Sequence, residues 1–217
     1  MNTDFPRPTA VQLQRAAVFP SATLHEAMGR TGALPSAIKP VVPSMRICGP
    51  AVTVAVKPLN NINIHRAIYL AKPGDILVVD VGGLAGLEGG YFGEIMAHAC
   101  VARQLGGLVI DGCVRDADLL EEIGFPVFSR GLAIHGTTKD EGGSIAAPIT
   151  LGGAIINPGD VIVGDRDGVV VVPLGGLDAA LESSQSREDK EAATIEKLKG
   201  GAATIELYGW SPLPKGS

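Results

Sequence analysis

The chain has 217 residues, of which 46% are hydrophobic and 19% are charged, a composition typical of a folded protein with one sizeable domain rather than a disordered one. Its net charge is −5 and no basic stripe is present, so it lacks the electrostatic footprint of a nucleic-acid-binding protein. No apolar run approaches the roughly 18 residues that a membrane helix needs, and the first residues do not have the pattern of a secretory signal.

Helices and strands are predicted to alternate along the first two-thirds of the chain. Ser21 is expected to cap the second helix and Gly29 to end it. The inward face of the helix over 93–105 is expected to consist of Ile95, Met96, Ala99, Cys100 and Ala102. In chain order the predicted elements are helix 9–17, helix 21–29, strand 49–57, helix 63–71, strand 76–81, glycine-rich loop 82–90, helix 93–105, strand 108–111, helix 117–123 and strand 127–129.

The last third of the chain changes character. Strands are predicted over 148–156 and 161–163, and a turn at 165–168 leads into a strand over 169–172. A long charged helix follows over 177–199, and its thin apolar stripe indicates packing on a neighbouring subunit. The proline-rich tail over 210–217 is expected to be peripheral. Helices that alternate with strands, followed by a group of strands, predict a single domain, 1–217, of mixed α/β layers.

The segment over 93–116, GEIMAHACVARQLGGLVIDGCVRD, has the strongest chemical signal. Glu94 opens a helix after a glycine-rich loop, so the amides of Glu94, Ile95 and Met96 are placed to receive a small anion. The spacing does not match a P-loop or a dinucleotide-binding fingerprint. The alternative is that Glu94 only stabilises the positive end of a helix.

Arg115 and Asp116 follow a predicted strand, where α/β sheets usually place their sites. Arginine grips a carboxylate or an enolate oxygen with a planar fork, and aspartate binds hard cations such as Mg²⁺. The alternative is that Asp116 caps the next helix while Arg115 pairs with a surface acid. Both alternatives stay open from the residues alone.

Five segments together resemble one family, the class II pyruvate aldolases and their RraA-like relatives. The resemblance covers most of the chain, and its core is an acidic residue, twenty residues, then Arg-Asp. It implies a layered α/β/β/α sandwich, related to the swivelling phosphohistidine domains, assembled as homotrimers or hexamers with sites between subunits. The segments are ATLHEAMGRTGAL (22–34), KPGDILVVD (72–80), YFGEIMAHACVARQLGGLVIDGCVRD (91–116), GFPVFSRG (124–131) and NPGDVIVGDRDGVVVVP (157–173).

The resemblance also implies roles for individual residues. Asp116 matches the family's metal-binding aspartate, and Arg115 matches its substrate-binding arginine. Glu94 matches the acid that hydrogen-bonds a water on the metal.

The substrate carboxylate would be held after Gly93 by the amides of Ile95 and Met96. Glu191, from a neighbouring subunit's C-terminal helix, and Glu26 are implied to face the metal waters.

The implied reaction is a retro-aldol cleavage that needs Mg²⁺ or Mn²⁺. The substrate is a small 2-oxo acid, 4-hydroxy-4-methyl-2-oxoglutarate or 4-carboxy-4-hydroxy-2-oxoadipate, met in aromatic-acid breakdown. A base removes the C4 hydroxyl proton, the C3–C4 bond breaks, and a pyruvate enolate is left. Oxaloacetate would give the same enolate by losing CO₂, so decarboxylation is a second expected activity.

Other assignments are possible. A Schiff-base aldolase would need a lysine of lowered pKa, for which Lys57 is the only candidate, and it is expected to reach solvent instead. His98 is expected to be a surface or packing histidine, and Cys113 a wall residue. The cysteines Cys48 and Cys100 are expected, with Cys113, to be reduced thiols of a cytoplasmic protein. The alternative function is an RraA-type regulator that binds and inhibits an RNA-degrading enzyme.

Overall fold

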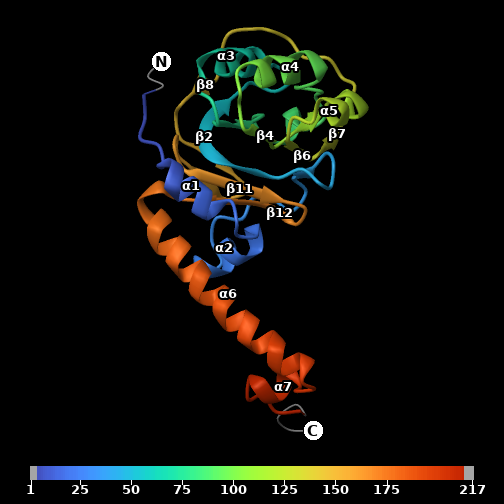
Figure 1. The fold of residues 1–217 in the computed structure, drawn as a ribbon. Helices are drawn as coiled ribbons and strands as arrows, with labels where there is room; N and C mark the ends of the chain where they lie inside the picture. The colour runs from blue at the N-terminus through green and yellow to red at the C-terminus, as the bar shows by residue number, and fades with distance from the viewer. Residues whose placement is uncertain (1–3, 213–217) are drawn as a thin grey trace.

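A computed structural model of the chain describes residues 4–212 and has a continuous sheet between two sets of helices (Figure 1). The sheet order is β1-β6-β4-β3-β2-β11-β12, and β8 also pairs with β2. The bounds of these strands are β1 Lys39–Pro40, β2 Ile47–Ala55, β3 Ile76–Asp80, β4 Gly107–Ile110, β6 Val127–Ser129, β8 Ser144–Ile145, β11 Val161–Asp165 and β12 Gly168–Val172.

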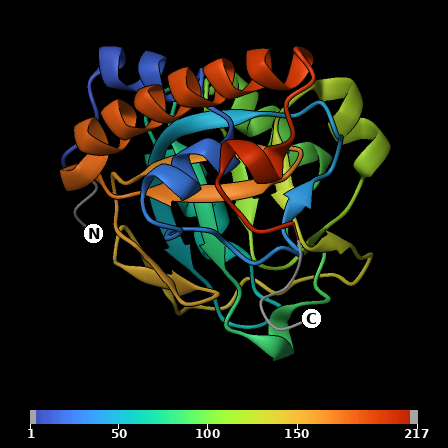
Figure 2. The same cartoon turned by 90° about the horizontal axis from the view of Figure 1, so that it is seen from below.

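Strand β2 joins the two halves of this sheet. It pairs in parallel with β3, with Ala51 opposite Ile76, and antiparallel with β11, with Pro50 opposite Val161. The parallel half, β2-β3-β4-β6, is covered by α3 Ile62–Leu70, α4 Glu94–Ala102 and α5 Ala117–Ile123 (Figure 1). The β11–β12 half is covered by α1 Ala10–Ala16, α2 Ser21–Ala27 and α6 Leu177–Lys199, of which α2 and α6 lie in front of it when seen from below (Figure 2).

The buried hydrophobic side chains of residues 4–212 form three clusters. One lies between helices α3–α5 and the parallel strands, one between the two β-layers, and one between β11–β12 and helices α1, α2 and α6. Leu77 and Val79 point into the cluster beneath α3 and α4, whereas Val78 between them points into the cluster between the two β-layers. Val161 and Val163 of β11 face the third cluster, with α1, α2 and α6. Strands buried on both faces read as continuous apolar runs, as these do. The expected α/β/β/α sandwich is confirmed.

Smaller elements complete the chain. The predicted strand over 148–156 is two strands, because Gly152 and Gly153 both adopt positive φ and turn the chain into a hairpin. The predicted loop over 82–90 contains one turn of 3₁₀ helix. The remaining bounds are β5 Cys113–Val114, β7 Gly131–Leu132, β9 Ile149–Leu151, β10 Ala154–Ile156, η1 Leu84–Gly86, η2 Leu174–Gly176 and α7 Thr204–Leu207.

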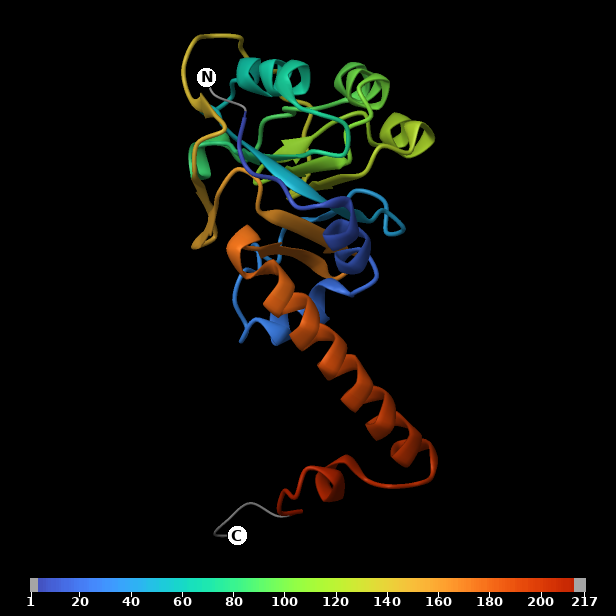
Figure 3. The same cartoon turned by 60° about the vertical axis from the view of Figure 1, so that its left-hand side comes forward.

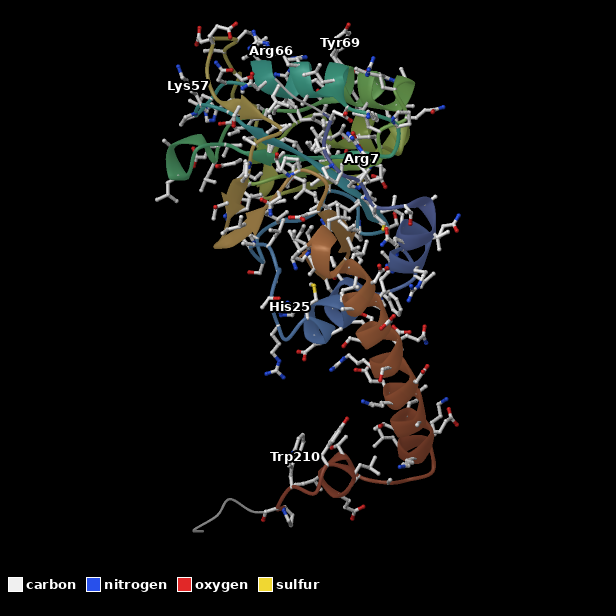
Figure 4. All side chains as sticks on the ribbon, turned by 90° about the vertical axis from the view of Figure 1, so that its left-hand side faces the viewer. Arg7, His25, Lys57, Arg66, Tyr69 and Trp210 are labelled. Carbon is white, nitrogen blue, oxygen red and sulfur yellow. The ribbon has the colours of Figure 1, made fainter. Side chains whose placement is uncertain are left out.

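Helix α6 leaves the body of the molecule as the sequence predicts from its polarity. Its buried residues all lie in its first two turns: Leu177, Ala180, Leu181 and Ser184. The rest projects outward and carries α7 and the stacked rings of Tyr208 and Trp210 at its far end (Figures 3 and 4). No helix within residues 4–212 is long and apolar enough to cross a membrane. The predicted tail beyond residue 212 lies outside the described residues.

Ser21 is not the cap of α2, contrary to expectation. Pro20 occupies the N-cap position, and Ser21 lies in the first turn. Its amide and hydroxyl both donate to the buried carboxylate of Asp165, at 2.8 and 2.7 Å, and the Asp167 amide donates at 3.0 Å. Burial raises the pKa of Asp165, but these bonds, with one from Gly168, outweigh it and leave the pKa below its usual value.

Asp165→Asn should therefore lower the free energy of unfolding by about 1–3 kcal/mol at pH 7, because a charged acceptor of several buried bonds is lost. Since the folded-state pKa is depressed, the stabilisation is present above the unfolded-state pKa and is lost as pH falls through the folded-state pKa. Urea unfolding from pH 7 down to pH 3 measures it. Asp167→Asn, at an exposed neighbour, is the control, and equal losses in both variants would contradict the assignment.

Candidate active site

Arg115 and Asp116 lie between β5 and α5, with Asp116 in the left-handed region at φ 60°, ψ 40°. Asp116 is the N-cap residue of α5, yet its side chain makes no capping bond. Instead its Oδ2 accepts a hydrogen bond of 3.1 Å from the amide of Glu94, at the start of α4. The interpretation of Asp116 as a side-chain cap of its helix is therefore wrong, and its left-handed conformation is one that aspartate adopts more readily than most residues.

Gly93 allows this close approach. A Cβ built on it would lie 2.2 Å from Asp116 Oδ2, far inside contact distance. The backbone of the two segments is also tied together, since the Arg115 amide donates to the Phe92 carbonyl at 2.9 Å. Any side chain at position 93 would push the Asp116 carboxylate away from the α4 terminus.

The amides at the start of α4 are not equivalent. That of Glu94 is bound to Asp116, and that of Met96 donates to the Gly93 carbonyl at 3.1 Å. The Ile95 amide has no acceptor among the described residues, and the Ile95 side chain is 76% exposed rather than on the inward face. Of the amides named from the sequence, Ile95 is the one free to bind an anion. The inward face of α4 is Met96, Ala97 and Cys100.

The side chains of Glu94 and Arg115 make different contacts. Arg115 is 48% exposed and its Nε lies 3.6 Å from Asp116 Oδ2, and no other acid among the described residues pairs with it. Glu94 is 41% exposed and its Oε1 is 4.0 Å from Nε2 of His98. The structure thus brings together Asp116, Arg115 and the start of α4, whereas the Glu94 carboxylate lies toward His98 and forms no ion pair with Arg115.

Arg115 and Asp116 form the wall between two cavities. The larger, of about 980 Å³, is flanked by the exposed apolar side chains of Leu132 and Ile134 and by Cys113. Burial and the charge of Glu88 raise the pKa of the Cys113 thiol, with Arg130 opposing, so a reactive thiolate is not favoured there. Cys113 is a wall residue, as expected.

The smaller cavity, of about 320 Å³, also contains Ile95 and Met96. Asn61, His65 and Lys139 line it too, and the sequence did not single them out as site residues. Burial and the nearby charge of Lys139 lower the pKa of His65, so its imidazole is neutral at pH 7. These residues come from α3 and from a loop distant in sequence, so only the fold reveals them.

Glu26 and Glu191, the two acids expected to face the metal waters, lie away from Asp116. Glu26 on α2 and Glu191 on α6 both pair with Arg187, at 3.8 and 2.8 Å, and Glu26 also pairs with Arg30 at 3.2 Å. These helices cover the opposite side of the sheet from α4 and α5 (Figure 1). Within one chain, neither acid joins Asp116.

Lys57 is exposed at the edge of the molecule, as expected, and lines neither cavity (Figure 4). Residues 4–212 contain no group of three acids, histidines or cysteines placed to hold a metal ion. Asp116 is the carboxylate that the sequence assigns to a metal, and one aspartate is enough for Mg²⁺ only where waters supply most of its ligands.

Comparisons with known proteins identify the family of the chain. Residues 21–171 match the RraA-like family model, described as Aldolase/RraA. A protein of Halalkalibacterium halodurans named "Putative 4-hydroxy-4-methyl-2-oxoglutarate aldolase" is 32% identical over 190 residues, which cover 88% of this chain and 90% of that one.

Solved structures are similar over most of the chain. An uncharacterised protein of Pseudomonas syringae pv. tomato has a TM-score of 0.82 at 28% identity, covering 92% of this chain and 93% of its own. Streptomyces coelicolor RraAS2, described as an unusual member of the RNase ES inhibitor RraA family, has a TM-score of 0.75 at 24% identity, covering 88% and 99%, and shows the fold alone. The chain belongs to the Aldolase/RraA family.

Proposed function

We propose that this protein is a divalent-metal-dependent aldolase that cleaves 4-hydroxy-4-methyl-2-oxoglutarate or 4-carboxy-4-hydroxy-2-oxoadipate. The products are pyruvate and either a second pyruvate or oxaloacetate, and decarboxylation of oxaloacetate is a side activity. The observation that carries the proposal is the Asp116 carboxylate, held by the Glu94 amide beside Arg115 and next to the unpaired Ile95 amide. The name of the Halalkalibacterium relative supports the same reaction.

Asp116 suits a metal ligand because one of its oxygens is left available. Oδ2 accepts the Glu94 amide, whereas no hydrogen bond from a described residue reaches Oδ1. Mg²⁺ or Mn²⁺ held at Asp116 would act as a Lewis acid on the 2-keto group of the substrate. The chain itself fixes the position of the Asp116 carboxylate and supplies its negative charge.

In the proposed reaction, each step is assigned to a residue of this site. The Ile95 amide holds the substrate carboxylate at the positive end of α4. A water oriented by the Glu94 carboxylate takes the C4 hydroxyl proton, and the C3–C4 bond breaks with its electrons moving to the C2 oxygen. The guanidinium of Arg115 stabilises that enolate oxygen. Protonation at C3 then gives pyruvate, and loss of CO₂ from oxaloacetate gives the same enolate.

We further propose that Glu26 and Glu191 act in the site of a neighbouring copy in a homotrimer or hexamer. Both acids pair with Arg187, so they would reach a second chain as one unit. The outer part of α6 is free of its own body and available for such packing (Figure 3).

No feature of the site favours the regulator of an RNA-degrading enzyme over an enzyme. Arg115 and Asp116 are both present and half-exposed in a cavity wall, as a substrate site requires. The regulator becomes the leading function only if the wild type proves unable to release pyruvate.

Asp116→Ala should lower pyruvate release from 4-hydroxy-4-methyl-2-oxoglutarate and from oxaloacetate by about 1,000-fold, because Lewis-acid stabilisation is worth several kcal/mol. Excess EDTA should have the same effect on the wild type. A coupled lactate dehydrogenase assay measures both. Asp118→Ala, at an exposed acid in the first turn of α5, is the control. Metal-independent turnover, or an active Asp116→Ala variant, would refute the mechanism.

Gly93→Ala should reduce kcat about 100-fold while the protein stays folded, because the new Cβ displaces the Asp116 carboxylate. Gly175→Ala is the matched control, since a Cβ there meets nothing within 4 Å. Steady-state kinetics, with circular dichroism to monitor folding, tests the pair. Full activity in Gly93→Ala would show that the carboxylate position is not needed.

Mixed assemblies test the shared site. Chains with Asp116→Ala and chains with Glu191→Ala should each be impaired, and co-expressed chains carrying two different tags should regain activity, because some sites then contain both wild-type residues. Activity is measured on the doubly tagged species. A mixture no more active than the better single variant would mean that Glu191 does not act in trans.

A further inference from the structure

Three asparagines at the start of α3 have similar burial but different bonding. Asn60, Asn61 and Asn63 are each at most 5% exposed, and the side-chain amide of each donates to a main-chain carbonyl. Asn60 Oδ1 accepts from the Ile62 amide at 3.0 Å, and Asn63 Oδ1 accepts from Arg66 at 3.3 Å. Asn61 Oδ1 alone of the three has no partner among the described residues.

The orientation of the Asn61 side chain is fixed by its neighbour. Its Nδ2 lies 2.8 Å from the Tyr91 carbonyl oxygen, which only accepts, so the amide nitrogen must face Tyr91. Asn61 is also the N-cap residue of α3, where an asparagine oxygen usually accepts from the first turn, but it makes no capping bond. This buried oxygen therefore neither caps α3 nor accepts another hydrogen bond within residues 4–212, and a buried acceptor usually has a donor.

The smaller cavity is the place from which that donor can come, because Asn61 lines it. Three donors lie in the same lining, the Ile95 amide, the Arg115 guanidinium and the Lys139 ammonium, beside one carboxylate, that of Asp116, which the proposed function assigns to the metal. Such a set selects an anion, and the oxygen of Asn61 requires that the anion also carry a hydrogen-bond donor. A carboxylate with a hydroxyl group meets both needs.

We propose that Asn61 Oδ1 accepts a hydrogen bond from the hydroxyl group of a hydroxy-carboxylate bound in the smaller cavity. The inference rests on the proposed function, in which the C4 hydroxyl is the group that loses its proton. Asn61 then makes the site prefer the hydroxylated substrate over carboxylates without that hydroxyl, including oxaloacetate and the keto acid product, whose carbonyl oxygen cannot donate to it.

Binding of two unreactive probes tests this without turnover. Citramalate has a hydroxyl, a methyl and two carboxylates, and methylsuccinate differs only in lacking the hydroxyl. Titration calorimetry with Mg²⁺ present should show citramalate binding about 10-fold or more tightly to the wild type, because methylsuccinate leaves the oxygen unpaired. The ratio of the two affinities should fall to about 1 in Asn61→Leu.

Asn63→Leu is the matched control, since it also removes a side-chain bond to a main-chain carbonyl but does not line the cavity. It should keep the wild-type ratio. Asn61→Ala, which also removes the acceptor, takes the place of Asn61→Leu if thermal melting shows that Asn61→Leu is unfolded, and its ratio should likewise fall to about 1. The proposal would be overturned if the wild type bound both probes equally well, or if the ratio of affinities were unchanged in Asn61→Leu. It would also be overturned if Asn61→Leu lost the same affinity for both probes, which is the result expected if the oxygen binds only a fixed water.

Turnover separates this inference from the aldolase proposal. In Asn61→Leu, kcat/KM for 4-hydroxy-4-methyl-2-oxoglutarate should fall about 10- to 100-fold, while oxaloacetate decarboxylation changes little. Equal losses on both substrates would contradict a hydroxyl contact. A wild type that releases no pyruvate but still binds citramalate in preference to methylsuccinate would refute the aldolase and retain the Asn61 site.

Discussion

The hydrogen bond from the Glu94 amide to Asp116 Oδ2 is the contact on which the candidate site depends. It holds Asp116 in a left-handed conformation and prevents it from capping its own helix. It also draws the end of β5 against the start of α4, and a glycine at position 93 is the condition for that approach. Glu94, Ile95 and Arg115 take their places because this junction is closed.

The acids named from the sequence divide into two groups in the structure. Asp116 and Glu94 lie beside the parallel strands and their helices, whereas Glu26 and Glu191 lie on helices that cover β11 and β12. Arg187 balances the second pair within the chain. A single copy therefore presents the Asp116 carboxylate at one end and an acidic pair balanced by Arg187 at the other, as the proposed shared site requires.

The layers were predictable because strands buried on both faces leave continuous apolar runs in the sequence, as in β3 and β12. Arg115 and Asp116 were also predictable, since the residues after a strand mark a sheet edge. The exposure of Ile95 was not predictable, because an apolar residue at its position in the helix is expected to face the core, whereas its side chain lies at a cavity. Nor was Asn61: its significance is an oxygen without a partner, which no residue pattern encodes.

The position of β2 has a consequence for how the protein is made. It pairs on one edge with β3, which follows it closely in the chain, but its other edge pairs with β8 and β11, which both come much later in the sequence. Contacts between distant segments form late, since the intervening chain must first be ordered. On the ribosome, the nascent chain would expose that edge of β2 until β8 and β11 emerged, and α6 would find the strands that it covers only after β11 and β12 had formed.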